Sequence, residues 1–453
     1  MKRACGKISV SAVAIVLVGV FCLGKMVGNH RYSQPDRVIA WDVLSYYAYL
    51  PAAIIEHDLS LSFLYREHAG TYWPETLPDG RLVVKTSMGV ALMYAPFFLV
   101  AHTLAPMLGY AADGFSQPYA FALMFAGLFY MLLGLVLLRR LLLMLYDEWV
   151  VAAALVIVAL CTNLYISSVH DAPMSHDFSL CLFALFALIS ERWDHSPGVM
   201  RSAALGLTLG LISLVRPSNV LVGLYFLFYG IDSRKALLAK AATLRATLPG
   251  LLVAAACAVA VWVPQMVYWR ANTGHFLFYS YGGRERFFFG DPKLLQGLFG
   301  WRKGWLVYTP SMLLAVAGMV PLYRSHRGHF WALAVFMAAN LYVVFSWWCW
   351  WYGGGFGLRA LIESYALLAI PLAEWLRWMW SRRAGLRVPL MVVSVALCGL
   401  SAFHSVQYIG GAIHWDSMTR AAYADSFLHK HPSPLFQSLL EEPDYEAARQ
   451  GRR

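Results

Sequence analysis

Charged residues are scarce in this sequence of 453 residues: only 13% are Asp, Glu, Lys or Arg, whereas 59% are hydrophobic. A soluble domain usually carries about a quarter of charged residues, so the composition excludes an ordinary soluble domain. Apolar runs of about 18–25 residues recur along the whole chain, while the alternation typical of barrel strands is missing. Because lipid satisfies no exposed backbone group, the sequence predicts an all-α polytopic membrane protein.

Cysteine provides no structural framework. The sequence has no CxxC pair and no Cys/His spacing typical of a zinc site. Most of the cysteines lie inside apolar runs, where they are expected to be small buried residues rather than disulfide partners or metal ligands. The seven are Cys5, Cys22, Cys161, Cys181, Cys257, Cys349 and Cys398.

Common catalytic signatures are also missing: the sequence contains no P-loop, no GxSxG and no HExxH. The stretch YGGGFGLR at 352–359 lies between two predicted helices and follows no strand, so it is not a dinucleotide fingerprint. Its glycines are expected to let the backbone approach a ligand, or to form a turn before Arg359 and Glu363.

The apolar runs predict about eleven transmembrane helices. The first follows Lys2, Arg3 and Lys7, and no A-x-A-like site comes after it, so we expect an uncleaved span, with a cleaved signal peptide as the alternative. No internal repeat divides the chain, which predicts a single membrane domain over 1–409. The spans are expected at 8–27, 118–138, 149–166, 178–191, 202–215, 218–231, 249–269, 305–322, 331–348, 360–378 and 388–409.

The net charge of +11 comes mostly from short loops between spans, where positive-inside sorting places basic residues, so no nucleic-acid partner is predicted. This sorting holds only if the run 86–108 does not cross the membrane. We therefore expect 86–108 to be a helix pair, broken at Pro96 and Pro106, in or dipping into the outer leaflet. The predicted location is the inner membrane, with the N-terminus cytoplasmic. The outer face then carries 28–117, 167–179, the turn at Arg216, 270–304, 347–364 and a polar tail, 410–453, too short for a folded domain.

The first outer segment contains WDVLSYYAYLPAAIIEHDLS at 41–60. On a helix, one face would hold Asp42, Ser45, Tyr46, Tyr49 and Glu56, and the other Val43, Leu44, Tyr47, Leu50, Ile54 and Ile55. The pattern predicts an amphipathic helix lying on the membrane and broken near Pro51, which could be a mere interfacial anchor. An anchor does not need a carboxylate among aromatics, so Asp42 is the candidate general base.

The other outer segments supply candidate binding groups. His170, Asp171, His176 and Asp177 match no strong metal template, so they predict either a polar rim that orients a substrate or ordinary hydrated side chains. Segment 270–304 interleaves aromatics with six basic residues and suits either a lipid-linked phosphate or phospholipid head groups. The six are Arg270, Arg284, Arg286, Lys293, Arg302 and Lys303. Three further cations, Lys85, Arg216 and Arg359, each lie at the outer end of an apolar run.

These features together resemble the GT-C class of integral-membrane glycosyltransferases, the lipid-phosphate-sugar-dependent type that includes protein O-mannosyltransferases and the lipid A aminoarabinose transferase. The motifs that carry the resemblance, spread over most of the chain, are Asp42 before SYYAYLP, KTSMG at 85–89, APMSHDFS at 172–179, LVRPSN at 214–219, GWRKGWLVYTP at 300–310 and WWYGGGFGLRALIE at 350–363. A large soluble C-terminal domain, as in oligosaccharyltransferases, is absent from this sequence.

The resemblance implies a transferase that uses a polyprenyl-phosphate sugar as donor, with Asp42 as catalytic base and an inverting displacement. It implies that Lys85, Arg216 and Arg359 hold the lipid phosphate. The acceptor is left open among lipid, glycan and protein. Val43 stands where many members have a second acid, so metal dependence is also left open and no metal ligand is predicted. The substrate-binding set is Tyr46, Glu56, Lys85, His176, Asp177, Arg216, Arg302, Lys303, Arg359 and Glu363.

Three alternatives share some of these features. A transporter or flippase of a lipid-linked saccharide would show paired repeats or broken helices, with ionisable residues deep in the spans. A non-catalytic scaffold would leave Asp42, His176, Arg216 and Arg359 far apart. An enzyme like the O-antigen ligases or polymerases would share the chemistry but rely on a larger late outer loop.

Overall fold

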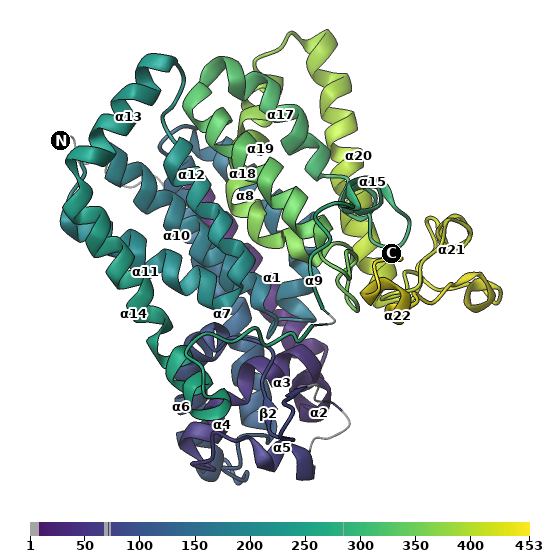
Figure 1. The fold of residues 1–453 in the computed structure, drawn as a ribbon. Coiled ribbons are helices and arrows are strands. Elements are labelled where there is room, and N and C mark those ends of the chain that lie inside the picture. Colours follow the sequence, from purple (N-terminus) through teal and green to yellow (C-terminus); the bar gives the residue numbers. More distant parts are fainter. Residues whose placement is uncertain (1–8, 68–70, 72–73, 284) are drawn as a thin grey trace.

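The computed structural model describes residues 9–67, 71, 74–283 and 285–453. Four residues named above, Lys2, Arg3, Lys7 and Arg284, lie outside this described part, as does Cys5. The described part is almost entirely helical (Figure 1). Its strands form one short antiparallel hairpin, β1 (Glu75–Thr76) and β2 (Leu82–Val83), in which Glu75 pairs with Val83.

The segment between α1 and α7 contains η1 (Arg31–Ser33), α2 (Pro35–Val38), α3 (Trp41–Tyr47), α4 (Tyr49–Ile54), α5 (Ser62–Glu67) and α6 (Gly89–Met107). The bundle consists of α1 (Val10–Gly28), α7 (Gln117–Leu142), α8 (Glu148–Leu160), α9 (Leu164–Val169), α10 (Ser175–His195), α11 (Val199–Val215), η2 (Pro217–Val222), α12 (Gly223–Phe228), α14 (Leu248–Thr273), α16 (Trp305–Tyr308), α17 (Met312–Ser325), α18 (Arg327–Ser346), η3 (Arg359–Ser364), α19 (Tyr365–Trp380) and α20 (Ala384–Ile409). The others are α13 (Arg234–Ala246), α15 (Leu294–Phe299), α21 (Arg420–Ser426), η4 (Phe436–Leu439) and α22 (Tyr445–Arg449).

Each predicted span coincides with a helical segment, but several are divided. The span 305–322 is split into α16 and α17 because Pro310 disfavours a helical conformation in the residue before it. The span 218–231 becomes a 3-10 turn followed by α12. Among the described residues, six helices are long and apolar enough to cross a membrane: α6, α7, α14, α18, α20 and the one that begins at Val10.

The run 86–108 differs from the prediction. It forms one continuous helix, α6, with Pro96 and Pro106 inside it rather than a broken pair. A proline removes one backbone hydrogen bond, and packing against α3 and α7 holds the helix together around that loss. Near its start, Ser87 donates to the Leu214 carbonyl (2.6 Å), and a Cβ on Gly89 would collide with the backbone at Leu214. This contact brings the segment after Lys85 to the outer end of α11.

The stretch 41–60 is also not the predicted surface helix. It breaks at Ala48 into α3 and α4, while Pro51 lies inside α4. Both of the faces predicted for it are largely buried, including Ser45 and Tyr49 as well as Leu44. Since α3 and α4 pack against α6, this segment is part of the core of the outer region rather than an interfacial anchor.

Two ends of the bundle can be distinguished in Figure 1. Helix α13 lies at one end, and α2 to α6 lie at the opposite end. We call the latter the outer end. Close helix packing sets the bundle geometry: α11 meets α14 where Gly206 and Gly210 face Ala254 and Ala258, and a side chain on either glycine would collide with α14.

The tail 410–453 is more ordered than predicted. Its helices α21 and α22 pack on the outer ends of neighbouring elements through two apolar clusters. The first joins Met418, Ala422 and Phe436 to Tyr308 and Phe356. The second joins Ala448 and Tyr445 to tryptophans in the loop that follows α18.

Candidate active site

Asp42 occupies the first turn of α3 at the outer end. Trp41, immediately before it, adopts a left-handed conformation (φ 54°), and its N–H donates to the Thr71 carbonyl at 2.9 Å. The Asp42 side chain is 42% exposed, and its Oδ2 accepts from the Nη2 of Arg359 at 3.0 Å. The pair joins residues 317 positions apart in the sequence.

Arg359 is fixed in place but retains capacity for a ligand. Its Nε donates to the Tyr352 carbonyl at 3.1 Å, while its Nη1 lies 3.9 Å from the Sδ of Met174, a weak acceptor. A Cβ on Gly355 would approach the Arg359 Cδ to 3.4 Å, and Gly355 has a φ of 132°, which favours glycine. The glycine-rich stretch therefore lets the backbone pass close beside this guanidinium.

The Asp42–Arg359 pair is the first of two charged groups. The second consists of Arg216, Glu363 and His176. Arg216, between α11 and η2, donates from Nη1 to Glu363 Oε1 at 2.9 Å. The other oxygen of this buried carboxylate lies 3.2 Å from the Nδ1 of His176. Because a carboxylate only accepts, Nδ1 carries the proton, and Nε2 of His176 has no partner among the described residues. The Arg216 guanidinium also lies over the Tyr352 ring at 5.7 Å.

Two tyrosines lie close to both charged groups. Burial raises the pKa of Tyr46, which lies in the field of Asp42, Arg216 and Arg359. Burial also raises the pKa of Tyr281, and the nearby Tyr46 and Asp42 add to the effect. Tyr281 was not predicted as a site residue, because nothing distinguishes it from the other aromatics of 270–304.

The second outer segment contributes a further ion pair. Asp171 Oδ1 lies 3.2 Å from Nη1 of Arg31 and 3.1 Å from Nδ1 of His170. Burial alone would raise the pKa of Asp171, but the hydrogen bond with His170 and the charges of His170 and Arg31 outweigh it and lower that pKa. Arg31 was also not predicted as a site residue. The one feature of the sequence that could have indicated it is its position as a basic residue shortly after the first span. This segment is held close to α7, since a Cβ on Gly127 would collide with the Ala172 carbonyl.

The remaining predicted residues have other neighbours. Lys85 is paired with Glu285 at 2.9 Å, and Glu285 also lies 3.8 Å from Arg449. Asp177 is buried and accepts from Ser168 at 3.0 Å.

Two basic residues of the fourth outer segment face the tail rather than the charged groups. Arg302 donates to the Asp416 and Glu441 carbonyls. Lys303 is buried and donates to the Gly355 and Trp415 carbonyls, and burial lowers its pKa to about 7. Glu56 is exposed beyond the end of α4, and no hydrogen bond or ion pair within the described residues joins it to Asp42 or Arg359.

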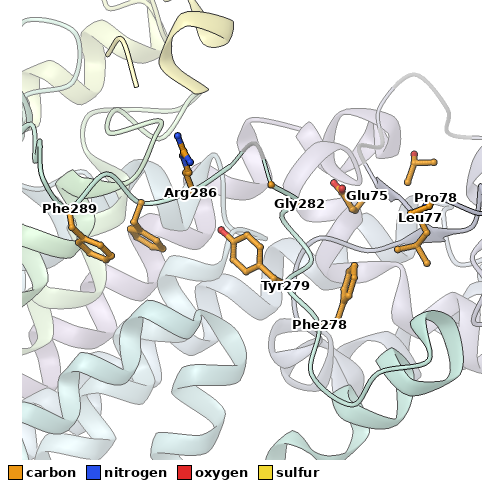
Figure 2. Close-up of a pocket in the computed structure, with 11 residues that line it drawn as sticks. Glu75, Leu77, Pro78, Phe278, Tyr279, Gly282, Arg286 and Phe289 are labelled. Atoms are coloured by element: carbon orange, nitrogen blue, oxygen red, sulfur yellow. The ribbon is translucent and has the colours of Figure 1, made fainter. Parts of the chain in front are cut away.

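A small cavity of about 20 Å³ connects the two charged groups. Arg359, Asp171 and His176 line it, together with Ser167, whose Oγ has no partner among the described residues. Its size and polar lining suit one ordered water. A larger open groove of about 670 Å³ lies further out, between the β1–β2 hairpin and 278–289 (Figure 2). Figure 2 shows Glu75, Leu77 and Pro78 on one side of it and Phe278 and Tyr279 on the other.

The charged groups do not provide a ready site for a divalent cation. Within the described ranges, no three His, Cys, Asp or Glu side chains converge closely enough to hold a metal ion. The partner of Asp42 is a guanidinium, and the nearby Asp171 is itself paired with Arg31. We therefore derive no step through a metal.

The described part of the chain is thus an all-helical bundle with a group of paired charges at its outer end. No family model matches the sequence, and no curated protein matches it. Among solved structures, the chain is similar to the archaeal oligosaccharyltransferase AglB from Archaeoglobus fulgidus in complex with an inhibitory peptide and a dolichol-phosphate. The TM-score is 0.50 at 14% identity, covering 96% of this chain and 61% of that one.

The apo form of the Archaeoglobus fulgidus oligosaccharyltransferase is similarly related. Its TM-score is also 0.50 at 14% identity, over 97% of this chain and 63% of that one. The chain thus spans less than two thirds of the length of these relatives. At this identity the likeness concerns the fold.

Proposed function

We propose that the chain is a membrane glycosyltransferase that moves a sugar from a polyprenyl-phosphate donor to an acceptor hydroxyl. The observation that carries this proposal is the Asp42–Arg359 pair: a half-exposed carboxylate and a guanidinium with an open edge, joined at the outer end of a GT-C-type fold. A base and a phosphate-binding cation side by side are the two groups that such a transfer requires.

In the proposed reaction, Asp42 takes the proton from the acceptor hydroxyl. The acceptor oxygen attacks the anomeric carbon from the side opposite the phosphate, and the bond between that carbon and the phosphate oxygen breaks. The electron pair leaves with polyprenyl phosphate, and Arg359 stabilises its charge. A single displacement inverts the anomeric centre. Because Asp42 is half-exposed, it can then return its proton to water.

The second charged group supports the same chemistry. Arg216 lies in the field of Tyr46 and Tyr281, as Asp42 does, so it is placed to add positive charge near the same phosphate. Glu363 holds Arg216 from a buried position, which fixes its orientation. We assign Glu363 and His176 to positioning rather than to direct contact with substrate.

The donor class is inferred from the fold and the site chemistry. One of the structurally similar oligosaccharyltransferases was solved in complex with a dolichol-phosphate, and this supports a lipid-linked donor. We propose an inner-membrane protein whose N-terminus is cytoplasmic and whose site faces the opposite side. The acceptor is any hydroxyl-bearing lipid, glycan or protein that reaches Asp42.

The proposal is tested with the purified protein and a panel of polyprenyl-phosphate sugars, following the release of polyprenyl phosphate. The Asp42→Asn variant should lose at least about 10²-fold in rate, because the base contributes about 10²–10⁴-fold to such reactions. It should keep the unfolding temperature of the wild type. Asp79→Asn is a matched control, since Asp79 is an exposed acid paired with Arg81 on the hairpin.

Substantial transfer by Asp42→Asn would remove Asp42 from its role. A flippase would instead move the lipid-linked sugar between leaflets without releasing polyprenyl phosphate, and that result would replace the enzymatic proposal.

A further inference from the structure

The glycine-rich segment 353–355 is a bare strip of backbone between the tail and Arg359. A Cβ on Gly353 would lie 3.7 Å from the Tyr445 hydroxyl, and one on Gly354 would lie 3.1 Å from the Trp415 ring. On Gly355, the next residue, the neighbour is the Arg359 side chain. We call this segment the glycine strip; one part of it faces the tail and the other faces the guanidinium.

Direct hydrogen bonds join the tail to this strip. The Gly355 N–H donates to the Trp415 carbonyl at 3.2 Å. The buried Lys303 ammonium donates to the same carbonyl at 2.5 Å and also to the Gly355 carbonyl, so it bridges the two segments. The Tyr445 hydroxyl donates to Asp416 Oδ2 at 2.7 Å and so holds the residue next to Trp415.

The last residues hold the other end of the same loop. Arg453 donates from Nη1 to the Ser346 carbonyl at 3.1 Å and to the Trp347 carbonyl at 2.6 Å, where α18 ends. The Arg449 guanidinium lies over the Trp348 ring at 4.9 Å. The tail therefore fixes the loop both at the end of α18 and at the glycine strip before η3.

We infer that the tail 410–453 is a positioning element of the active site, which sets the orientation of Arg359 through the glycine strip and so strengthens binding of the donor phosphate. Trp415, Tyr445 and Lys303 act through the backbone and touch no substrate. The inference about the donor rests on the proposed function. The inference that the tail orients Arg359 through its contacts with the glycine strip does not depend on that function.

The link is tested with the full chain carrying Gly354→Ala. The new methyl group would press on the Trp415 ring, and no positive φ is involved, so the change strains only the contact with the tail. Gly290→Ala is the matched control: Gly290 also lies in an outer loop, but its Cβ would meet nothing within 4 Å. Tyr445→Phe is a second, gentler variant that removes a single hydrogen bond.

Two measurements are made on each variant. Hydrogen exchange of the amides of 353–363 should be about tenfold faster in both variants than in the wild type. Gly354→Ala strains the contact with Trp415, and Tyr445→Phe removes one hydrogen bond of the tail. Binding of undecaprenyl phosphate should weaken by about tenfold in both variants. In an Arg359→Lys background, neither variant should weaken binding further. If the tail were merely structural, each variant would weaken binding equally in both backgrounds.

Unchanged exchange at 353–363 in both variants would overturn the inference, and so would equal losses of binding with and without Arg359. Failure of the wild type to bind undecaprenyl phosphate would count against the proposed donor, and the exchange result alone would then decide whether the tail positions Arg359.

Discussion

Helix α10 connects two groups of buried polar side chains that differ in how well they are satisfied. His176 in its first turn belongs to the outer charged group, and Glu191 near its other end belongs to a group at the end where α13 lies. Glu191 accepts from His329 and from Tyr225, each at 3.1 Å. Nearby, Lys240 and Asp194 pair at 2.6 Å.

The unpartnered atoms are distributed unequally between the two groups. Within the described residues, no atom of Glu191, His329, Lys240 or Asp194 is buried without a partner. The outer group leaves His176 Nε2, Ser167 Oγ and Asp177 Oδ2 without one. Since buried polar atoms are normally paired, the completed group is expected to support the fold, and the incomplete one is expected to hold ordered water.

The largest expected contrast is between Glu191→Gln and Asp42→Asn. Glu191→Gln should lower the free energy of unfolding by about 1–3 kcal/mol, because it weakens two buried hydrogen bonds. The activity per folded molecule should stay the same, which is the opposite of the outcome for Asp42→Asn. Denaturant unfolding in detergent and the release assay measure both. Loss of activity without loss of stability in Glu191→Gln would contradict the assignment of the Glu191 group to the support of the fold.

The two buried lysines give a finer contrast. Lys240 has a carboxylate partner, whereas the hydrogen bonds of Lys303 within the described residues go to the carbonyl oxygens of Gly355 and Trp415. Burial lowers the pKa of Lys303 from 10.5 to about 7. Between these two pH values the unfolded chain binds the extra proton, so stability should rise with pH from about 7 towards 9; below 7 the cost of the buried charge is fully present.

Lys303→Met should flatten this rise in the unfolding temperature. Lys293→Met should leave it unchanged, because Lys293 is an outer-loop lysine that already pairs with Asp291. An identical pH dependence in Lys303→Met and the wild type would contradict the assignment of the effect to Lys303.

The smallest effect is expected at Glu56, which the helical pattern had assigned to the same face as Asp42. The structure places its side chain in solvent past the end of α4. Glu56→Gln should therefore change the transfer rate less than about twofold and stability by less than about 0.5 kcal/mol. A loss comparable to that of Asp42→Asn would return Glu56 to the site.

The sequence was sufficient for the helical class, for the positions of the helical segments and for several members of the outer charged group. Length and hydrophobicity of a run are local properties, and Arg216 and Arg359 stood out as charges at the ends of such runs. The pairing of charges was not predictable, since Lys85 and Arg302 look equivalent to Arg359 until the fold supplies Glu285 to one and tail carbonyls to the other.

The errors near Asp42 have a similar origin. The projection of 41–60 assumed one helix with a lipid-facing side, but the chain bends at Ala48 and is packed on both faces. Pro96 is accommodated inside α6 by tertiary packing, which cannot be predicted from the local sequence. The role of the tail depends on contacts with a loop 60 to 107 positions earlier and was not visible from its polar composition.

The separation of 317 residues between Asp42 and Arg359 has a consequence for biosynthesis. At ribosomal speeds of about 5–20 residues per second, the guanidinium is made on the order of tens of seconds after the carboxylate. During that interval the nascent chain carries Asp42 without the guanidinium that pairs with it. On the proposed function, incompletely translated copies in the membrane would be inert, and transfer would begin only when nearly all the helices have been inserted.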